Sequence, residues 1–276
     1  MRLPFVQIDA FADAPFTGNP AAVIALAAWL PDAVLQAIAQ ENNLAETAFI
    51  VPCIDPETAD FDLRWFTPGV EVALCGHATL ASGHLVLSAV AGMQEVRFST
   101  IKAGVLTVAR AGDGYEMALP SWPADVAVTG ADMAAIGAAL GAAPAEVWAR
   151  GSDYRVAVFA SAVEVRALDP DFRAIIALQT GRDLMIVATA PGAGDTSGAD
   201  VVSRVFVPEA GVDEDSVTGS AHAIIAGYWA KRLGRDSFTA FQASTRGGHV
   251  GCRLVGDRAV LTGKARTVIE GEFILP

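Results

Sequence analysis

Two turns of related sequence, about half the chain apart, most constrain how these 276 residues can fold. The first is LCGHATL at 74–80, and the second is SVTGSAH at 216–222. Each follows a segment of the order Arg-x-Phe-x-Pro, which begins at Arg64 in the first case and at Arg204 in the second. Similarity at a fixed offset indicates a repeat, so we expect two halves of similar architecture.

The segment that follows each turn is predicted to be a helix buried on nearly all sides. Residues 77–90 and 220–234 have no wide polar face until their ends, and Gly234 is a typical helix stop. A helix that is apolar nearly all round must be covered all round, which a curled sheet can do. Strand-like alternation is plentiful in the rest of the chain, and 31–41 and 132–141 are predicted as outer helices.

We therefore predict an α+β fold of two pseudo-twofold-related domains, each a curved, mostly antiparallel sheet wrapped around a central apolar helix. Two prolines interrupt the pattern in PSWPAD at 120–125, which places the boundary there. The predicted domains are residues 1–120 and 121–276, with the extreme termini free to cross over.

Composition excludes several classes of partner. Hydrophobic residues make up 53% of the chain and charged residues 18%, which favours extensive burial. A net charge of −12 without a basic cluster argues against nucleic acid and against anionic membranes. The longest apolar run, 21–30, is shorter than the roughly 20 residues that span a bilayer. Three cysteines without CxxC spacing are interpreted as reduced thiols of a cytoplasmic protein.

Four blocks together resemble the PhzF-like phenazine-biosynthesis family, in the family's order over the whole chain. They are FTGNPAAV (16–23), NLAETAF (43–49), LCGHAT (74–79) and EDSVTGSAH (214–222). The resemblance implies two domains as in diaminopimelate epimerase, a site in the cleft between them, no cofactor and a homodimer. One departure is Ser216, where many members have proline; serine can cap the helix instead, so we expect the helix to survive.

Glu46 is the predicted general acid/base. It shares a strand face with Ala48 and Ile50 in NLAETAFIV. Burial on an apolar face disfavours the ionised form of a carboxyl group, which makes it a usable proton donor and acceptor. Spacing alone favours an ordinary exposed glutamate at a sheet edge. The resemblance reverses that preference, because the family uses this glutamate as its acid/base.

The resemblance adds His77, Asp215 and Ser220 to the catalytic group. Taken alone, such residues are more often a core histidine, a helix cap and local polar filling. By resemblance, His77 lies close to the carbon that gains or loses the proton, and Asp215 and Ser220 handle protons and orient the substrate. His84 is interpreted as structural. Two histidines without a third ligand do not make a metal site, so no metal is expected.

Gly76 and Gly219 are predicted to bind substrate by letting backbone N–H groups approach it. Two helix N-termini that face one cleft would offer free N–H donors and two positive dipole ends, which suit a carboxylate. The predicted partner is therefore a small carboxylate-bearing metabolite. Asn19 in FTGNP is predicted as a further polar contact, or otherwise as a turn residue before Pro20.

Cys75 is weighed against a racemase mechanism. Cofactor-free racemases and epimerases of the related fold use one cysteine from each repeat, and Cys75 stands where the first would be. The second repeat offers Ser216, whose hydroxyl is a far weaker carbon base than a thiolate. A two-thiol racemase is therefore disfavoured, and Cys75 is interpreted as a small apolar residue. The Gly-x-Gly within 184–198 is followed by another strand, so it predicts a loop and not a dinucleotide site.

The predicted function is a cofactor-independent isomerase that moves a proton between carbons of a small carboxylate-bearing substrate. The first alternative is a cofactor-independent amino-acid racemase or epimerase. The second is a non-catalytic small-acid-binding protein, which would be expected to lack a polar group at position 46, 77 or 215; all three are present.

Overall fold

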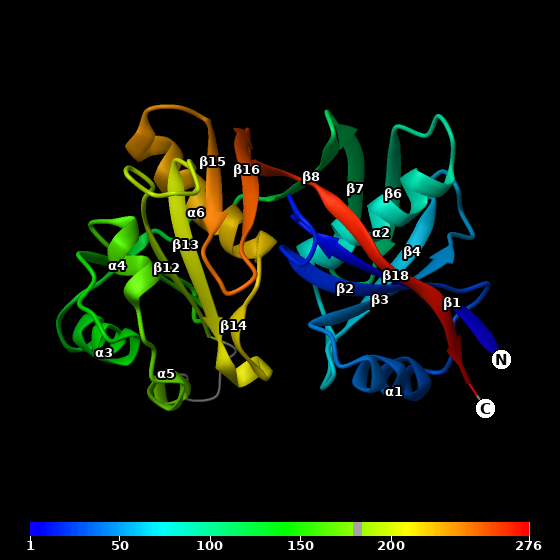
Figure 1. Ribbon diagram of the computed structural model, residues 1–276, viewed down its shortest axis with the longest axis horizontal. Coiled ribbons are helices and arrows are strands. Elements are labelled where there is room, and N and C mark those ends of the chain that lie inside the picture. Colours follow the sequence, from blue (N-terminus) through cyan, green and yellow to red (C-terminus); the bar gives the residue numbers. More distant parts are fainter. Residues whose placement is uncertain (179–183, 276) are drawn as a thin grey trace. The chain divides into compact units, whose positions relative to one another are not determined.

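The computed structural model describes residues 1–178 and 184–275, and its helices and strands are drawn in Figure 1. The chain divides into two compact units, Met1–Leu119 with the residues from Val260 onward, and Pro120–Ala259. The last strand belongs to the first unit because it pairs along the first strand of the chain. The predicted second domain, 121–276, includes this strand, and the prediction leaves the extreme termini free to cross over. Among the described residues, no helix combines the length and the apolar character needed to cross a membrane.

The first unit consists of a sheet, one central helix and one outer helix. Its elements in chain order are β1 (Arg2–Ala10), β2 (Asn19–Ala25), α1 (Asp32–Asn42), β3 (Glu46–Pro52), β4 (Phe61–Phe66), β5 (Glu71–Val72), α2 (Gly76–Ala89), β6 (Glu95–Thr100), β7 (Gly104–Ala111), β8 (Gly114–Pro120) and β18 (Ala265–Ile274).

The second unit has the same kinds of element with more outer helices. In chain order they are β9 (Val126–Val128), α3 (Gly130–Leu140), β10 (Glu146–Arg150), β11 (Tyr154–Val158), α4 (Ala162–Ala167), α5 (Phe172–Leu178), β12 (Met185–Pro191), β13 (Val201–Val207), the 3₁₀ turn η1 (Pro208–Ala210), β14 (Val212–Asp215), α6 (Gly219–Leu233), β15 (Ser237–Gln242) and β16 (Gly248–Val255). Strand β17 (Arg258–Gly263) begins in this unit and continues into the first, which resumes at Val260.

The two units repeat one order of strand pairings. In the first, β1–β2 is antiparallel, β2–β3 parallel, β3–β4 and β4–β5 antiparallel, β4–β6 parallel and β6–β7 antiparallel. In the second, β10–β11, β11–β12, β12–β13, β13–β14, β13–β15 and β15–β16 follow the same sequence of directions. This repeated pairing, with a helix inside each unit, confirms the predicted α+β epimerase-like fold. A duplication as its origin stays an inference.

The central helices α2 and α6 are buried over most of their length, as their apolar sequences predict. Residues 76–83 of α2 and 221–226 of α6 are all buried. The sheet approaches α2 so closely that a Cβ atom at Gly83 would lie 2.4 Å from a methyl group of Val108 on β7. Glycine is therefore required where the helix passes this strand. The exposed residues of both helices lie at their C-terminal ends, at Ser88 and Ala89 of α2 and at Lys231 and Arg232 of α6.

The Arg-x-Phe-x-Pro repeat forms the same ion pair in both units. Arg64 on β4 binds Glu71 through Nε and Nη2, at 2.7 and 2.8 Å. Arg204 on β13 binds Glu214 in the same two-point way, at 2.8 Å for each bond. Each guanidinium also lies over the phenylalanine two residues later in its strand, at 5.1 and 5.0 Å. The ion pair fixes the short strand that leads into the central helix, so the motif acts on the position of the helix start.

We expect the Arg204–Glu214 pair to stabilise the fold measurably. Its side chains are only 12% and 17% exposed, so solvent screens the pair weakly. A double-mutant cycle with Arg204→Met and Glu214→Gln, measured by urea unfolding, is expected to give a coupling free energy of about 1–2 kcal/mol. The control pair Arg2–Glu272 is 65% and 52% exposed and is expected to give less than about 1 kcal/mol. Equal coupling energies for the two pairs would contradict the expectation.

Candidate active site

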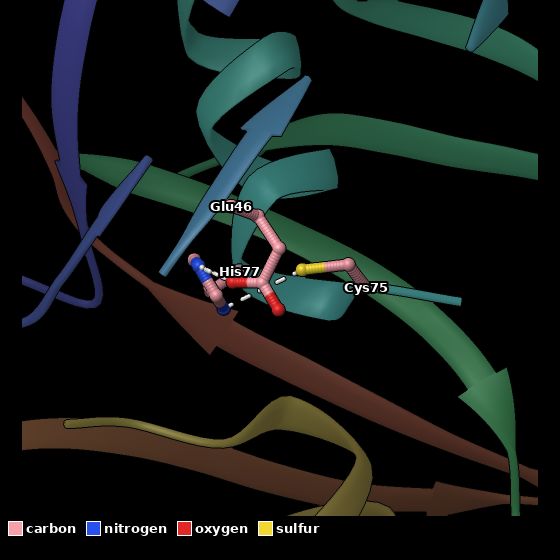
Figure 2. A group of neighbouring side chains, drawn as sticks. All are labelled: Glu46, Cys75 and His77. Carbon is pink, nitrogen blue, oxygen red and sulfur yellow. Dashed lines mark hydrogen bonds and ion pairs between the residues drawn. The ribbon is translucent and has the colours of Figure 1, made fainter. Parts of the chain in front are cut away.

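Three chemically active side chains of the first unit gather at the N-terminal end of α2 (Figure 2). Glu46 is the first residue of β3, Cys75 precedes α2 as its N-cap, and His77 is the second residue of that helix. Oε2 of Glu46 lies 3.0 Å from Nε2 of His77. Sγ of Cys75 lies 3.5 Å from Nδ1 of the same ring. A carboxyl, a thiol and an imidazole thus share one small volume, which we call the Glu46 cluster.

Asn19, the first residue of β2, supports the Glu46 cluster from the other side of the ring. Its side chain is buried, and its Nδ2 lies 3.1 Å from Nδ1 of His77. With the amide nitrogen facing it, Nδ1 accepts, and the neutral ring carries its proton on Nε2, toward Glu46. If the amide turns over, its oxygen can accept from Nδ1–H of a protonated ring. Asn19 therefore suits both charge states of His77, while its predicted contact with substrate stays a prediction.

The contact between Glu46 and His77 is close but poorly directed. Their facing oxygen and nitrogen are at ion-pair distance, yet both atoms are buried without a well-aligned hydrogen bond. A buried polar atom left in this state costs about 1–3 kcal/mol. Such atoms call for a functional explanation, and acid/base pairs often align only when a substrate lies between or beside them.

The charges in the Glu46 cluster follow from burial and from proximity. Burial alone lowers the pKa of His77, but Cys75 and Glu46 together raise it well above its usual value. Burial raises the pKa of the Cys75 thiol, and Glu46 adds to that effect. A thiol whose pKa is raised stays neutral, so Cys75 carries no charge that could stabilise a protonated His77. We attribute the raised pKa of His77 to the Glu46 carboxylate, which lies 3.0 Å away.

The second unit gathers the other predicted residues at the N-terminal end of α6. Asp215 ends β14, and its carboxylate accepts hydrogen bonds from the backbone of Ser216, at 2.9 Å, and from the hydroxyl of Thr218. Ser220 is the second residue of α6 and hydrogen-bonds Tyr154, the first residue of β11. Asp215, Gly219 and Ser220 therefore belong to one local group, while Glu46, His77, Asn19 and Gly76 belong to the first unit.

Two further residues, Gln242 and Tyr154, contact this second group and were not predicted from the sequence. The side chain of Gln242, at the end of β15, accepts from the backbone N–H of Thr218 at 2.8 Å and donates to the carbonyl of Asp215 at 2.7 Å. Tyr154 carries the other missed contact, the hydrogen bond to Ser220. Burial raises the pKa of Tyr154, although Ser220 opposes the shift. Neither residue lies in a motif, so only the three-dimensional contacts of β15 and β11 with the start of α6 reveal them.

The expected cap of the second helix is corrected by the structure. Ser216 was expected to cap this helix, but α6 begins at Gly219 with Thr218 as its N-cap. The backbone N–H of Ser216 is bonded to Asp215, and its carbonyl accepts from Ser244 at 2.7 Å, so Ser216 belongs to the turn before the helix. The helix survives the absence of proline at 216, as predicted.

The structure also shows which residues of the two halves correspond. Cys75 and Thr218 are the two N-caps, so the counterpart of Cys75 is Thr218 and not Ser216. One turn later, Thr79 donates to the carbonyl of Cys75 at 2.6 Å, and His222 bonds the carbonyl of Thr218 at 2.8 Å. The counterpart is still a hydroxyl, so the second thiol of a two-thiol racemase is missing on either comparison.

The same correspondence shows that the scaffold repeats while the chemistry does not. Glu46 pairs with Ala21 at the start of β3, and Met185 pairs with Tyr154 at the start of β12. The position that Glu46 occupies at the start of β3 is therefore occupied by Met185 at the start of β12. Conversely, Asp215 follows Glu214 on β14, where Val72 follows Glu71 on β5. Each half therefore supplies a different set of polar groups to the N-terminal end of its central helix.

Both central helices begin with backbone donors that no capping side chain satisfies. Neither Cys75 nor Thr218 makes a side-chain capping hydrogen bond to its helix. The first N–H groups of α2 and α6 can therefore bind an anion, with help from the helix dipole.

Fold and site geometry define an epimerase-like α+β protein with acid/base groups at the start of a buried helix. The sequence profile of the phenazine biosynthesis-like PhzC-PhzF family matches residues 8–271, and the chain belongs to this family. An uncharacterized isomerase of Pseudomonas aeruginosa is 44% identical over the full length of both chains. A PhzF family crystal structure from Enterococcus faecalis matches with a TM-score of 0.87 and 37% identity, covering all of both chains.

More distant solved structures share the fold. A hydroxyproline epimerase from Agrobacterium vitis matches with a TM-score of 0.58 at 14% identity, covering 99% of this chain and 91% of that one. At that identity the likeness shows the fold alone. The family and the names of its nearer relatives place the chain in a class of enzymes, the isomerases.

Proposed function

We propose that the chain is a cofactor-independent isomerase that shifts a proton between carbons of a small carboxylate-bearing substrate. The observation that carries the proposal is the contact of Glu46 with His77, at 3.0 Å, beside the N-terminal end of α2. Proton transfer between two carbons needs one group that accepts a proton and returns it nearby. A carboxylate can do both, and an adjacent imidazole can stabilise its charge or exchange the proton with it.

In the proposed reaction, the Glu46 carboxylate accepts the proton of a substrate C–H bond. The electron pair of that bond passes into the neighbouring unsaturated system, and the protonated Glu46 returns the proton to a second carbon. His77, 3.0 Å from the carboxyl group, is placed to stabilise its charge during the transfer. From the family resemblance we infer that Asp215 and Ser220 handle protons and orient the substrate, and that Gly76 and Gly219 let the helix N–H groups approach the substrate carboxylate.

A racemase or epimerase is the second candidate, and the presence of Cys75 in the Glu46 cluster is what favours it. Against it stands Thr218 at the corresponding cap, because a threonine hydroxyl is a far weaker carbon base than a thiolate. A thiol with a raised pKa is also a poor source of thiolate.

Hydrogen exchange at carbon tests both candidates in one experiment. The enzyme is incubated in D₂O with a panel of small cyclic acids and amino acids, and the loss of C–H signals is followed by NMR. An isomerase is expected to move deuterium to a second carbon, whereas a racemase introduces it at the inverted centre. A panel of acids that bind without any enzyme-dependent exchange would support a non-catalytic binder and would contradict the proposal.

We also expect a homodimer, on the basis of the family resemblance. Light scattering at micromolar concentration is expected to give about twice the 28.6 kDa of one chain. A mass of a single chain under these conditions would contradict the expectation.

A further inference from the structure

We propose that Cys75, His77 and Glu46 also form a binding site for Zn²⁺. Each residue offers one ligand atom, and these atoms all lie within 4.8 Å of one another (Figure 2). The other histidine of α2, His84, takes no part in the site, because its ring bonds Tyr115 and Thr267. The inference goes beyond the proposed isomerase activity, because it concerns a cation and can be tested without any substrate.

The spacing of the ligand atoms suits a tetrahedral ion. Zinc bonds of about 2.0–2.3 Å place neighbouring ligand atoms roughly 3.3–3.8 Å apart. Oε2 of Glu46 lies 3.0 Å from Nε2 of His77, close to that range, whereas Sγ of Cys75 lies 3.5 Å from the other ring nitrogen, Nδ1. Because all three ligand atoms lie within 4.8 Å of one another, a small side-chain rotation brings the third into range of an ion bound to one ring nitrogen. One ring nitrogen binds the ion and the other remains facing Asn19, whose amide can present its oxygen to an N–H group. A ligand histidine held by such an outer hydrogen bond is typical of zinc sites.

Burial makes the cluster receptive to a cation. Cys75 and His77 are 6% and 4% exposed, so competition from water is small. Oε2 of Glu46 and Nε2 of His77 are both buried without an aligned hydrogen bond. A metal ion that binds both groups supplies the partner that their present geometry does not. This second observation, independent of the spacing, also points to a ligand.

The types of ligand select the metal. Sulfur and imidazole nitrogen suit zinc, whereas Mg²⁺ and Ca²⁺ require mostly oxygen ligands and the cluster offers a single carboxylate. On binding, the S–H bond of Cys75 is replaced by an S–Zn bond, and its proton, with any proton on the coordinating ring nitrogen, leaves to the buffer. The thiolate and the Glu46 carboxylate then balance the charge of the ion, and the N-terminal end of α2 stabilises the thiolate.

Three protein ligands leave a fourth position for water or a small acid. The site is therefore expected to hold the ion reversibly, unlike a four-ligand structural site. An ion there occupies Glu46 and His77, so Zn²⁺ is expected to inhibit the proposed proton transfer.

Cobalt substitution reports directly on the thiol. Co²⁺ is titrated into the reduced protein, and the thiolate-to-metal charge-transfer absorbance is followed. Wild type is expected to show a band that saturates at one ion per chain and disappears when Zn²⁺ is added. Cys53→Ser is the matched control, since Cys53 is a half-buried free cysteine outside the cluster, and it is expected to behave as wild type. Cys75→Ser is expected to lose the band.

The Glu46→Gln variant tests the third ligand while keeping the thiol. It is expected to retain the band but to bind Zn²⁺ at least tenfold more weakly, because losing a ligand costs no less than losing an outer-shell contact. The proposal is overturned if wild type shows no band, if Cys75→Ser keeps it, or if Cys53→Ser loses it. An unchanged Zn²⁺ affinity in Glu46→Gln removes the carboxylate from the site and overturns the three-ligand arrangement. Because wild type and Glu46→Gln both keep Cys75, these tests stand even if Cys75→Ser does not fold.

Discussion

Replacing Glu46 by glutamine is expected to lower turnover by about 10²-fold or more while leaving the binding of a carboxylate ligand intact. The substitution keeps the size and hydrogen-bonding capacity of the side chain but removes the group that accepts and returns the proton. General acid/base groups contribute typically 10²–10⁴-fold to rate, which sets the expected loss. Binding is expected to survive because the substitution leaves the backbone N–H groups at the starts of α2 and α6 unchanged.

The measurement compares kcat and ligand affinity for matched variants, once a substrate of the exchange panel is known. Glu57→Gln is the control, because it makes the same chemical change at an exposed glutamate of the same unit, away from the cluster. It is expected to keep the wild-type rate. A wild-type rate in Glu46→Gln would remove Glu46 as the base and leave His77 or Asp215 to be tested in that role.

The features that sequence predicts well are those set by local periodicity. The segments expected as buried helices, 77–90 and 220–234, are α2 (Gly76–Ala89) and α6 (Gly219–Leu233), each shifted by one residue. A helix without a polar face has few ways to be folded, so its enclosure by a sheet follows from composition alone. The Gly-x-Gly segment likewise lies between β12 and β13, as the absence of a following helix predicted.

The features that sequence missed depend on which strands become neighbours. The two Arg-x-Phe-x-Pro segments were recognised as a repeat, but their glutamate partners were not. Glu71 and Glu214 reach the arginines only because β5 and β14 fold back antiparallel on β4 and β13. Gln242 approaches Thr218 because β15 pairs with β13, a crossover that no short motif encodes.

Cys75 shows the limit of comparing motifs position by position. Its apolar interpretation followed from the missing partner thiol, and its burial agrees with that interpretation. Its place beside His77 could not be foreseen, because the N-cap of α2 and the start of β3 approach each other only in three dimensions. A residue can thus be unsuited to one mechanism and still lie among the groups of the site.

His222 is expected to make the stability of the protein depend on pH. It occupies the position of Thr79 in the repeat, is fully buried, and bonds the carbonyl of Thr218 through Nδ1 at 2.8 Å. Burial lowers its pKa from 6.5 to about 4, against the opposing effect of that hydrogen bond. The folded protein therefore resists protonation of a group that the unfolded chain protonates readily.

The sign of the effect follows from the two pKa values. Above pH 6.5 the ring is neutral in both states, and its contribution to the free energy of unfolding does not change with pH. As the pH falls from 6.5 toward 4, only the unfolded chain takes up the proton, so stability is lost. At about 1.4 kcal/mol for each unit of pKa difference, the full loss is about 3 kcal/mol.

A substitution taken from the repeat isolates this loss. In His222→Thr, a hydroxyl can make the bond that Thr79 makes to the carbonyl four residues earlier, and no titrating ring remains. The variant loses packing at every pH, so the comparison uses the change in unfolding free energy between pH 7 and pH 4.5, measured in urea. Wild type is expected to lose about 2–3 kcal/mol more than His222→Thr over this interval. His249→Gln, at a half-buried histidine of the same unit, serves as the control and is expected to follow wild type. Equal losses in wild type and His222→Thr would show that the buried ring does not titrate between the folded and unfolded states as its burial requires.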